Sequence, residues 1–323
     1  MTWFVEEGIG EERAIRVKDG AIVAAKLAWP GEMAAGAVVD AKLVSRPAGS
    51  PRGTARLDDG TLVLVDRLPR AASEGASIRI EITRASIGEA GRVKLAQGRP
   101  SEHAPCTAPT LARRLAQSGE SVRTVHRFAV SGWNELCAEA RECRVDFAGG
   151  AIVLSPTPAM TLIDVDGDLP PPALALAAAD AIGAALHRFE IGGSVGIDFP
   201  TLSDKADRRA VGDRLGNALD QLAHERTAMN GFGFVQIVSR LSGPSILHRI
   251  ARDPLGAAAR RVLRMAESVE GPGALLITCH PALEAALRPE WRDALIRRSG
   301  RQLRIAADPA LAPTAGFAQS VPL

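Results

Sequence analysis

The sequence predicts an α/β fold built on a parallel βαβ unit, with a small β domain before it and a small α/β domain after it. Two apolar runs rich in β-branched residues, 161–163 and 194–197, flank an Ala-rich helical segment at residues 174–189. A strand, a helix and a second strand within about 45 residues imply parallel strands and a right-handed crossover. Short alternating stretches before residue 95 indicate the separate β domain.

The N-terminal region predicts a small barrel. Residues 12–94 consist of short alternating stretches, and Asp19-Gly20 and Asp59-Gly60 are typical hairpin turns. Roughly five strands in about eighty residues favour a closed sheet, with the OB type as the leading candidate. We therefore assign residues 1–96 to an OB-type β domain.

Residues 97–142 are predicted to connect the N-terminal domain to the central domain. Residues 97–110 are polar and Pro-rich, which is typical of a linker. Residues 111–143 are mostly helical in pattern, with a break near Val130-Ser131-Gly132. We assign residues 97–142 to a linker and residues 143–242 to the central α/β domain, in which residues 204–229 predict a second, Arg-rich helix.

The C-terminal region predicts a small α/β domain over residues 243–308. Its expected elements are a basic helix, a strand, a second helix and an alternating stretch, at residues 254–268, 274–278, 281–287 and 301–306. Residues 309–323 are rich in Pro and Ala, and we expect a disordered tail there.

Composition bounds the class of protein. The chain has 323 residues, of which 46% are hydrophobic and 24% charged, as is typical of soluble globular proteins. No apolar run reaches membrane-spanning length and the first ten residues are acidic, so we expect no membrane contact and a cytoplasmic location. The four cysteines form no CxxC pair, which argues against a zinc site. The net charge of +2 neither requires nor excludes a polyanionic partner.

Acidic residues stand at the ends of both predicted parallel strands. Asp164 and Asp166 are two residues apart, so both side chains point to one face of a strand, and Asp198 ends the neighbouring strand. Ligands of open α/β sheets bind outside the carboxyl ends of the strands, where clustered carboxylates can hold Mg²⁺. The alternative, equally open from the residues alone, is that each Asp caps a helix or a turn.

Several blocks resemble, in order, the catalytic domain of the RNase E/G family of endoribonucleases. The matching segments read GGAI, IDVD, GGSVGIDF, RRAVGDRL, HER and FGFVQIVSR, at residues 149–152, 163–166, 192–199, 208–215, 224–226 and 232–240. The N-terminal strands are similar to that family's OB-type RNA-binding domain, and residues 86–95 to its closing segment.

The resemblance implies an RNase H-like catalytic domain that hydrolyses RNA phosphodiesters with Mg²⁺. By the resemblance, Asp164 and Asp198 are the metal ligands, Asp166 replaces an Asn that assists the attack, and Arg226 is an Arg close to the site. The side chains expected to contact RNA are basic residues near these blocks, namely Arg92, Lys94, Arg208, Arg209 and Arg214. For most arginines of the second helix, a solvated helix face is the alternative.

The chain also departs from the family pattern. Only about fifty residues separate the N-terminal domain from the acidic strands, so by the resemblance residues 97–142 hold a linker and a reduced remnant of the family's 5′-monophosphate sensor, and we expect cleavage without 5′-end sensing. The missing CPxC zinc-link argues against the family's tetramer and leaves a monomer or a homodimer. Trp3 and Trp29 are the only aromatic candidates for base stacking that we identify in the N-terminal domain, so RNA binding is expected to depend on Arg and on low salt.

We therefore predict a Mg²⁺-dependent endoribonuclease that cuts single-stranded RNA to 5′-phosphate and 3′-hydroxyl ends, in RNA decay or in processing such as that of rRNA. The alternative is an RNA-binding or ribosome-associated factor that keeps the fold without efficient turnover. A third interpretation is a metal-dependent hydrolase of small nucleotides.

Overall fold

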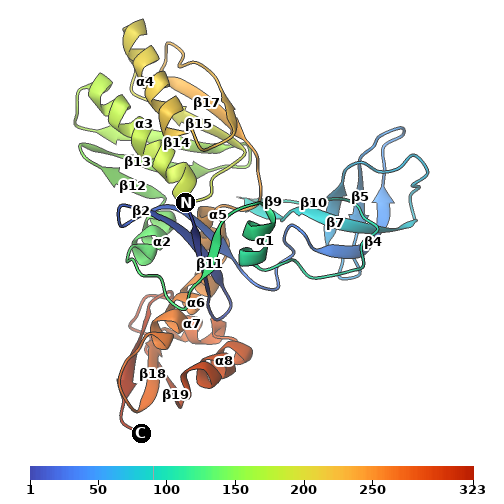
Figure 1. The fold of residues 1–323 in the computed structure, drawn as a ribbon, viewed down its shortest axis with the longest axis vertical. Helices are drawn as coiled ribbons and strands as arrows, with labels where there is room; N and C mark the ends of the chain where they lie inside the picture. The colour runs from blue at the N-terminus through green and yellow to red at the C-terminus, as the bar shows by residue number, and fades with distance from the viewer. Residues whose placement is uncertain (90) are drawn as a thin grey trace.

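The computed structural model describes residues 1–89 and 91–323. Within these residues it has a four-stranded sheet, a closed five-stranded barrel, a six-stranded sheet, a three-stranded sheet, a two-stranded hairpin and helices α1–α8. The barrel projects to one side of the body, and the C-terminal sheet lies at the end of the molecule opposite the six-stranded sheet (Figure 1). The predicted mixed α/β fold with a small barrel is confirmed.

The first three strands form a separate sheet, in the order β11-β1-β2-β3. Its strands are β1 (Trp3–Glu7), β2 (Glu12–Lys18), β3 (Ala21–Ala28) and β11 (Val122–Thr124). Asp19 and Gly20 turn β2 into β3 with φ of 52° and 77°, as a type I′ hairpin requires. The assignment of residues 1–96 to one β domain is corrected, because Ile15, Ala25 and Leu27 pack into the core of the central domain.

The barrel begins later in the chain than the sequence suggested. Its order is β10-β6-β5-β4-β7, with β4 (Val38–Ser45), β5 (Gly53–Arg56), β6 (Leu62–Val65), β7 (Ser77–Arg84) and β10 (Ala96–Pro100). Strand β10 closes the barrel by pairing with both β6 and β7, so this part of the predicted linker is a strand. Strand β10 could not be predicted from hydrophobic alternation, because its sequence is polar and only Ala96 belongs to the barrel core.

The connection between the barrel and the central domain is less helical than predicted. Helices α1 (Leu111–Gln117) and α2 (Trp133–Glu142) are separated by β11, and Gly132 precedes α2 with φ of 110°. Before the last barrel strand, β8 (Ile87–Glu89) and β9 (Arg92–Lys94) form the two-stranded hairpin.

The central sheet has the order β12-β13-β14-β15-β17-β16. Its strands are β12 (Arg144–Phe147), β13 (Gly150–Pro156), β14 (Thr161–Gly167), β15 (Ser194–Asp198), β16 (His224–Arg226) and β17 (Phe234–Ser239). Strands β14 and β15 are parallel and are joined by α3 (Pro171–Arg188), which confirms the predicted βαβ unit. The other neighbours are antiparallel.

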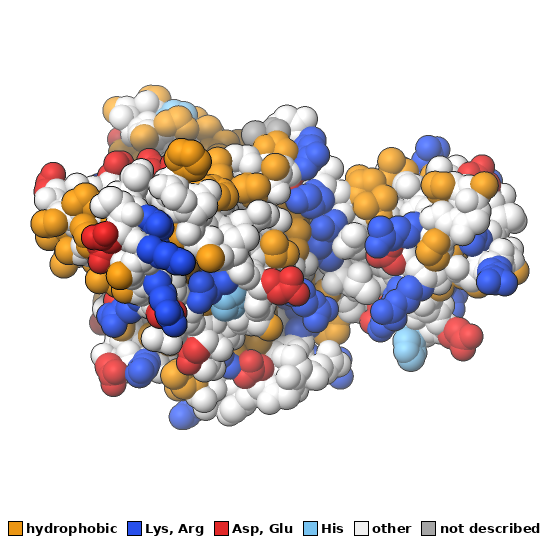
Figure 2. Space-filling view, turned by 90° about the horizontal axis from the view of Figure 1, so that it is seen from above, with side chains coloured by type: hydrophobic (Ala, Val, Ile, Leu, Met, Phe, Trp, Pro, Cys, Tyr) orange, Lys and Arg blue, Asp and Glu red, His pale blue; other side chains and the backbone are white. Residues whose placement is uncertain are grey.

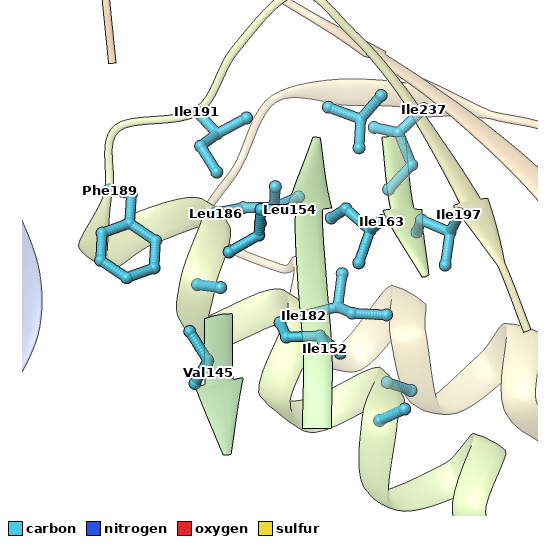
Figure 3. Close-up of a cluster of buried hydrophobic side chains, with 14 of the residues drawn as sticks. Val145, Ile152, Leu154, Ile163, Ile182, Leu186, Phe189, Ile191, Ile197 and Ile237 are labelled. Carbon is cyan, nitrogen blue, oxygen red and sulfur yellow. The ribbon is translucent and has the colours of Figure 1, made fainter. Parts of the chain in front are cut away.

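Helices α3 and α4 (Lys205–Ala218) cover one face of the central sheet, and we call the other face the open face. Figure 3 shows Ile152, Ile163 and Ile197 directed from the strands toward Ile182 of α3, and all four are fully buried. The predicted helix over residues 204–229 ends at Ala218, because the chain turns and returns to the sheet as β16.

The C-terminal domain contains α5 (Ile246–Arg252), α6 (Pro254–Glu267), α7 (Pro281–Ala286) and α8 (Pro289–Ser299), with β18 (Ala274–Cys279), β19 (Leu303–Ala307) and β20 (Gly316–Val321). The expected helices and strands up to residue 308 are confirmed. The predicted disordered tail is wrong, because β20 pairs with β18 along six residues and so satisfies its backbone groups. Among the described residues, no helix is long and apolar enough to cross a membrane.

A buried stack of alternating rings and guanidinium groups joins the N-terminal sheet to the C-terminal domain. The Arg260 guanidinium lies 4.1 Å from the ring centre of Trp29 and 4.7 Å from that of Trp291. Its Nε donates to the carbonyl oxygen of Gly10 at 2.7 Å, and an Nη atom lies 3.5 Å from Asp253. Cation–π contacts strengthen when water is excluded, and Arg260 is only 4% exposed.

Candidate functional site

Three carboxylates lie together on the open face of the central sheet. Asp164 and Asp198 are direct register partners on the parallel strands β14 and β15, which places their Cα atoms about 4.8 Å apart. Asp166 is two residues further along β14, on the same face and about 7 Å from Asp164. All three residues are exposed.

The alternation of β14 explains this placement. Ile163 and Val165 are buried under the helices, so the residues between and after them point to the open face. At the end of β15, Ile197 and Phe199 are buried on either side of Asp198 and fix its direction. The Oδ1 atom of Asp164 also accepts the backbone N–H of Val165 at 3.0 Å.

The donor set of this cluster is made of oxygen atoms alone. Among residues 1–89 and 91–323, no group of three or more His, Cys, Asp or Glu side chains is arranged to hold a metal ion. Mg²⁺ commonly binds proteins through one or two carboxylates, keeps several waters and takes further oxygens from substrate phosphates. The pair formed by Asp164 and Asp198 fits that mode, and a closed protein cage is not required.

An apolar patch adjoins the carboxylates, and the sequence analysis missed it. A Cβ atom added to Gly196 would lie 2.8 Å from Phe234 Cζ, 3.0 Å from Leu162 Cδ2 and 3.0 Å from Met160 Sδ, so these side chains converge over the glycine. Phe234 is the register partner of Asp198, and nearby Phe232 is 83% exposed. The signal was present in the FGF turn, but a short motif does not reveal the face on which it lies.

Arg226 is not brought to the carboxylates. It opposes Ile237, which is fully buried on the helix-covered face. Its guanidinium lies against α4, where a Cβ added to Gly216 would meet Arg226 Nη2 at 2.7 Å. The predicted role close to the acidic site is therefore corrected, since the alternation of β16 turns Arg226 to the opposite side of the sheet.

The arginines of α4 also lie on the helix-covered side. Arg214 forms two hydrogen bonds to the carboxylate of Asp180 on α3, at 2.7 and 2.6 Å, and these bonds raise the pKa of Arg214. Arg208 donates to the carbonyl oxygens of residues 202 and 203 before α4. Arg209 extends into solvent, 4.0 Å from Asp213. Arg208 and Arg214 thus tie α4 to its neighbours, Arg209 is solvated, and none of the three is gathered with the carboxylates.

Arg92 and Lys94 lie in a second place, on the β8–β9 hairpin. Both form ion pairs with Glu89, at 2.7 and 2.8 Å, and Arg92 also donates to the carbonyl oxygen of Pro158 in the loop before β14. Burial raises the pKa of Glu89, but the hydrogen bonds from Lys94 and Arg92 outweigh it and lower the pKa overall. The hairpin is thereby attached to one end of the central sheet.

The predicted site residues thus separate into the carboxylate cluster on the open face, the structural arginines on the helix-covered side, and the basic hairpin. No family model matches the chain, and the resemblance stated for its central blocks stays a prediction.

Proposed function

We propose that the protein is a Mg²⁺-dependent endoribonuclease that hydrolyses single-stranded RNA and leaves 5′-phosphate and 3′-hydroxyl ends. The observation that carries the proposal is the register of Asp164 with Asp198 on adjacent parallel strands, with Asp166 on the same face. Three exposed carboxylates this close repel one another, and a divalent cation between them relieves the repulsion.

Asp164 and Asp198 would hold the metal ion, and the flanking buried residues keep both carboxylates directed to the open face. When bound, Mg²⁺ supplies charge neutralisation at the phosphate and a more acidic water molecule. The Asp166 carboxylate, one strand repeat away, accepts a hydrogen bond from the water that attacks phosphorus and so orients it. The bond between phosphorus and the 3′ oxygen breaks on the opposite side of the phosphate; the attacking water releases its proton to solvent, and the 3′ oxygen takes a proton from solvent to become the 3′ hydroxyl.

The apolar patch supports a single-stranded substrate. Phe234 stands beside Asp198, and Phe232, two residues earlier in the same turn, is 83% exposed. An exposed aromatic ring can stack on an unpaired base but not on one inside a duplex. Each such stack contributes about 1–3 kcal/mol to binding. In this proposal the five-stranded barrel is an OB-type RNA-binding domain, the central domain is RNase H-like, and the enzyme acts in cytoplasmic RNA processing or decay.

The test is cleavage of a labelled single-stranded RNA by the full chain, with Mg²⁺ and with EDTA. We expect product only with Mg²⁺, and a loss of at least about a hundredfold in rate for Asp198→Asn, because a charged ligand is replaced by a neutral one. Asp213→Asn is the matched control, since Asp213 is an exposed carboxylate on α4. Intact RNA with wild-type protein and Mg²⁺, or equal rates for the two variants, would overturn the proposal.

The second candidate is an RNA-binding factor without turnover. The direction of Arg226 favours this candidate. Arg226 was expected close to the reacting phosphate, but its side chain points to the helix-covered face, so the carboxylates lack this cation. This candidate predicts that the wild-type chain binds the labelled RNA with or without EDTA and forms no product in either condition.

A further inference from the structure

Two adjoining cavities lie between the barrel and the central domain. One, of about 460 Å³, reaches Asp59 and Thr61 at the β5–β6 turn of the barrel. The other, of about 410 Å³, reaches Cys143 and Pro156 of the central domain. The two cavities share four of their lining residues, Gly88, Val93, His248 and Arg252. Together the cavities form one groove, and we call these four residues its shared wall.

Arg252, the last residue of α5, is placed in the groove by the absence of a side chain at Gly88. A Cβ atom there would lie 2.8 Å from Arg252 Cδ and 3.3 Å from Arg252 Nε, so the arginine rests directly on the glycine backbone. Arg252 is exposed, and within the described part of the chain no carboxylate forms an ion pair with it. Its charge is therefore available to a ligand.

His248, one turn earlier on α5, adds a neutral donor. The Ser245 Oγ accepts the backbone N–H of His248 at 3.3 Å and lies 2.7 Å from its Nδ1. The Ser245 contact occupies Nδ1 and leaves Nε2 for a ligand; when the Ser245 hydroxyl is the donor, the ring proton resides on Nε2. Burial lowers the pKa of His248, so the ring is neutral at pH 7.

The charge of the groove favours an anion at its central-domain end. Arg92 lines that end, and Lys94 lies beside it, so with Arg252 the cationic side chains outnumber the one local carboxylate, Glu89, which is already paired. Figure 2 shows Lys and Arg side chains gathered along the junction between the barrel and the body. At the barrel end, the Glu32 carboxylate pairs with Arg249, and Asp59 accepts the backbone N–H of Thr61.

We propose that the shared wall binds a backbone phosphate of single-stranded RNA between the barrel and the central domain, with Arg252 and His248 Nε2 as donors. The identity of the polymer rests on the proposed function. Val93, 51% exposed, offers an apolar contact to the adjacent sugar or base. Pro156 lines the groove and is the register partner of Thr161, so the groove reaches the central sheet at the end of β14 that lies about 10 Å along the strand from Asp164.

The experiment measures the affinity of the full chain for a labelled, unstructured single-stranded RNA by fluorescence anisotropy in EDTA, over a range of salt concentrations. We expect Arg252→Gln to weaken binding about fivefold to tenfold and to reduce the slope of log affinity against log salt by about 0.7, the effect of one lost phosphate contact to a single strand. Gly88→Ala should weaken binding in the same direction, because its Cβ displaces Arg252.

Arg297→Gln is the matched control, since Arg297 is also an exposed arginine in the last turn of a helix. Equal changes in slope for Arg252→Gln and Arg297→Gln would overturn the inference, as would an unchanged slope for Arg252→Gln. If wild-type protein binds RNA through Arg252 but does not cleave it with Mg²⁺, only the hydrolysis is refuted. If wild-type protein binds no RNA, both proposals fail.

Discussion

The direction of single side chains decides what each face of the central sheet can do. Asp164 and Asp198 point to the open face, whereas Arg226, also on a strand of that sheet, points to the helices. The spacing of Asp164 and Asp166 was sufficient to predict that they share a face, because alternation within one strand is a local property. The side taken by Arg226 depends on how β16 pairs with β17, which residues 224–226 alone do not reveal.

Burial also separates the cysteines by reactivity. Burial raises the pKa of the Cys137 thiol to about 11, so about one molecule in a thousand carries the reactive thiolate at pH 8. Burial likewise raises the pKa of Cys143 and Cys279, while Cys106 is exposed. We expect a thiol reagent at pH 8 to modify Cys106 first, and all four cysteines only in denaturant. Rapid modification of native Cys106→Ser protein would contradict this.

Local patterns predicted elements well and their partners less well. The βαβ unit was predictable because its strands are apolar runs and its helix is a continuous Ala-rich segment between them. Strands β10 and β20 were missed because their polar or Ala-rich sequences carry little hydrophobic signal, and pairing with distant strands stabilises them. The grouping of β1 to β3 failed for a similar reason, since their alternation does not show which core their apolar face joins.

The closure of the barrel by β10 gives a prediction about one glycine. A Cβ atom at Gly98 would lie 2.3 Å from Ile80 Cγ2 and 2.8 Å from the carbonyl oxygen of Glu81 on β7. Because the backbone atom cannot move without opening the pair, we expect Gly98→Ala to lower the free energy of unfolding by about 1–3 kcal/mol. Urea denaturation measures the change. Gly231→Ala is the control, with nothing within 4 Å of the added atom, and an equal effect there would refute the argument.

Contacts between distant segments hold the whole molecule together. Glu11 forms ion pairs with Arg13 and with Arg264 of α6, and Arg260 is enclosed by Trp29 and Trp291. Helix α5 also packs against β8, and residues of both line the groove between the barrel and the central domain. The groove was unpredictable from sequence, since Gly88 and Arg252 are 164 positions apart.

The contacts of Arg260 with Trp29 and Trp291 should govern the cooperativity of unfolding. Arg260→Ala removes both ring contacts and leaves the Gly10 carbonyl and the Asp253 carboxylate without this donor. Losing a desolvated cation–π contact costs about 2 kcal/mol, and losing a hydrogen bond from a charged donor costs about 1.5–3 kcal/mol. Here both losses fall on the surface between the N-terminal sheet and the C-terminal domain. We therefore expect Arg260→Ala to lower the urea midpoint and to split one transition into two, followed by tryptophan fluorescence and circular dichroism. Arg288→Ala, which removes an exposed guanidinium 4.7 Å from the Trp291 ring, should leave a single transition. Coincident curves from both probes for Arg260→Ala would show that the domains are coupled by other contacts.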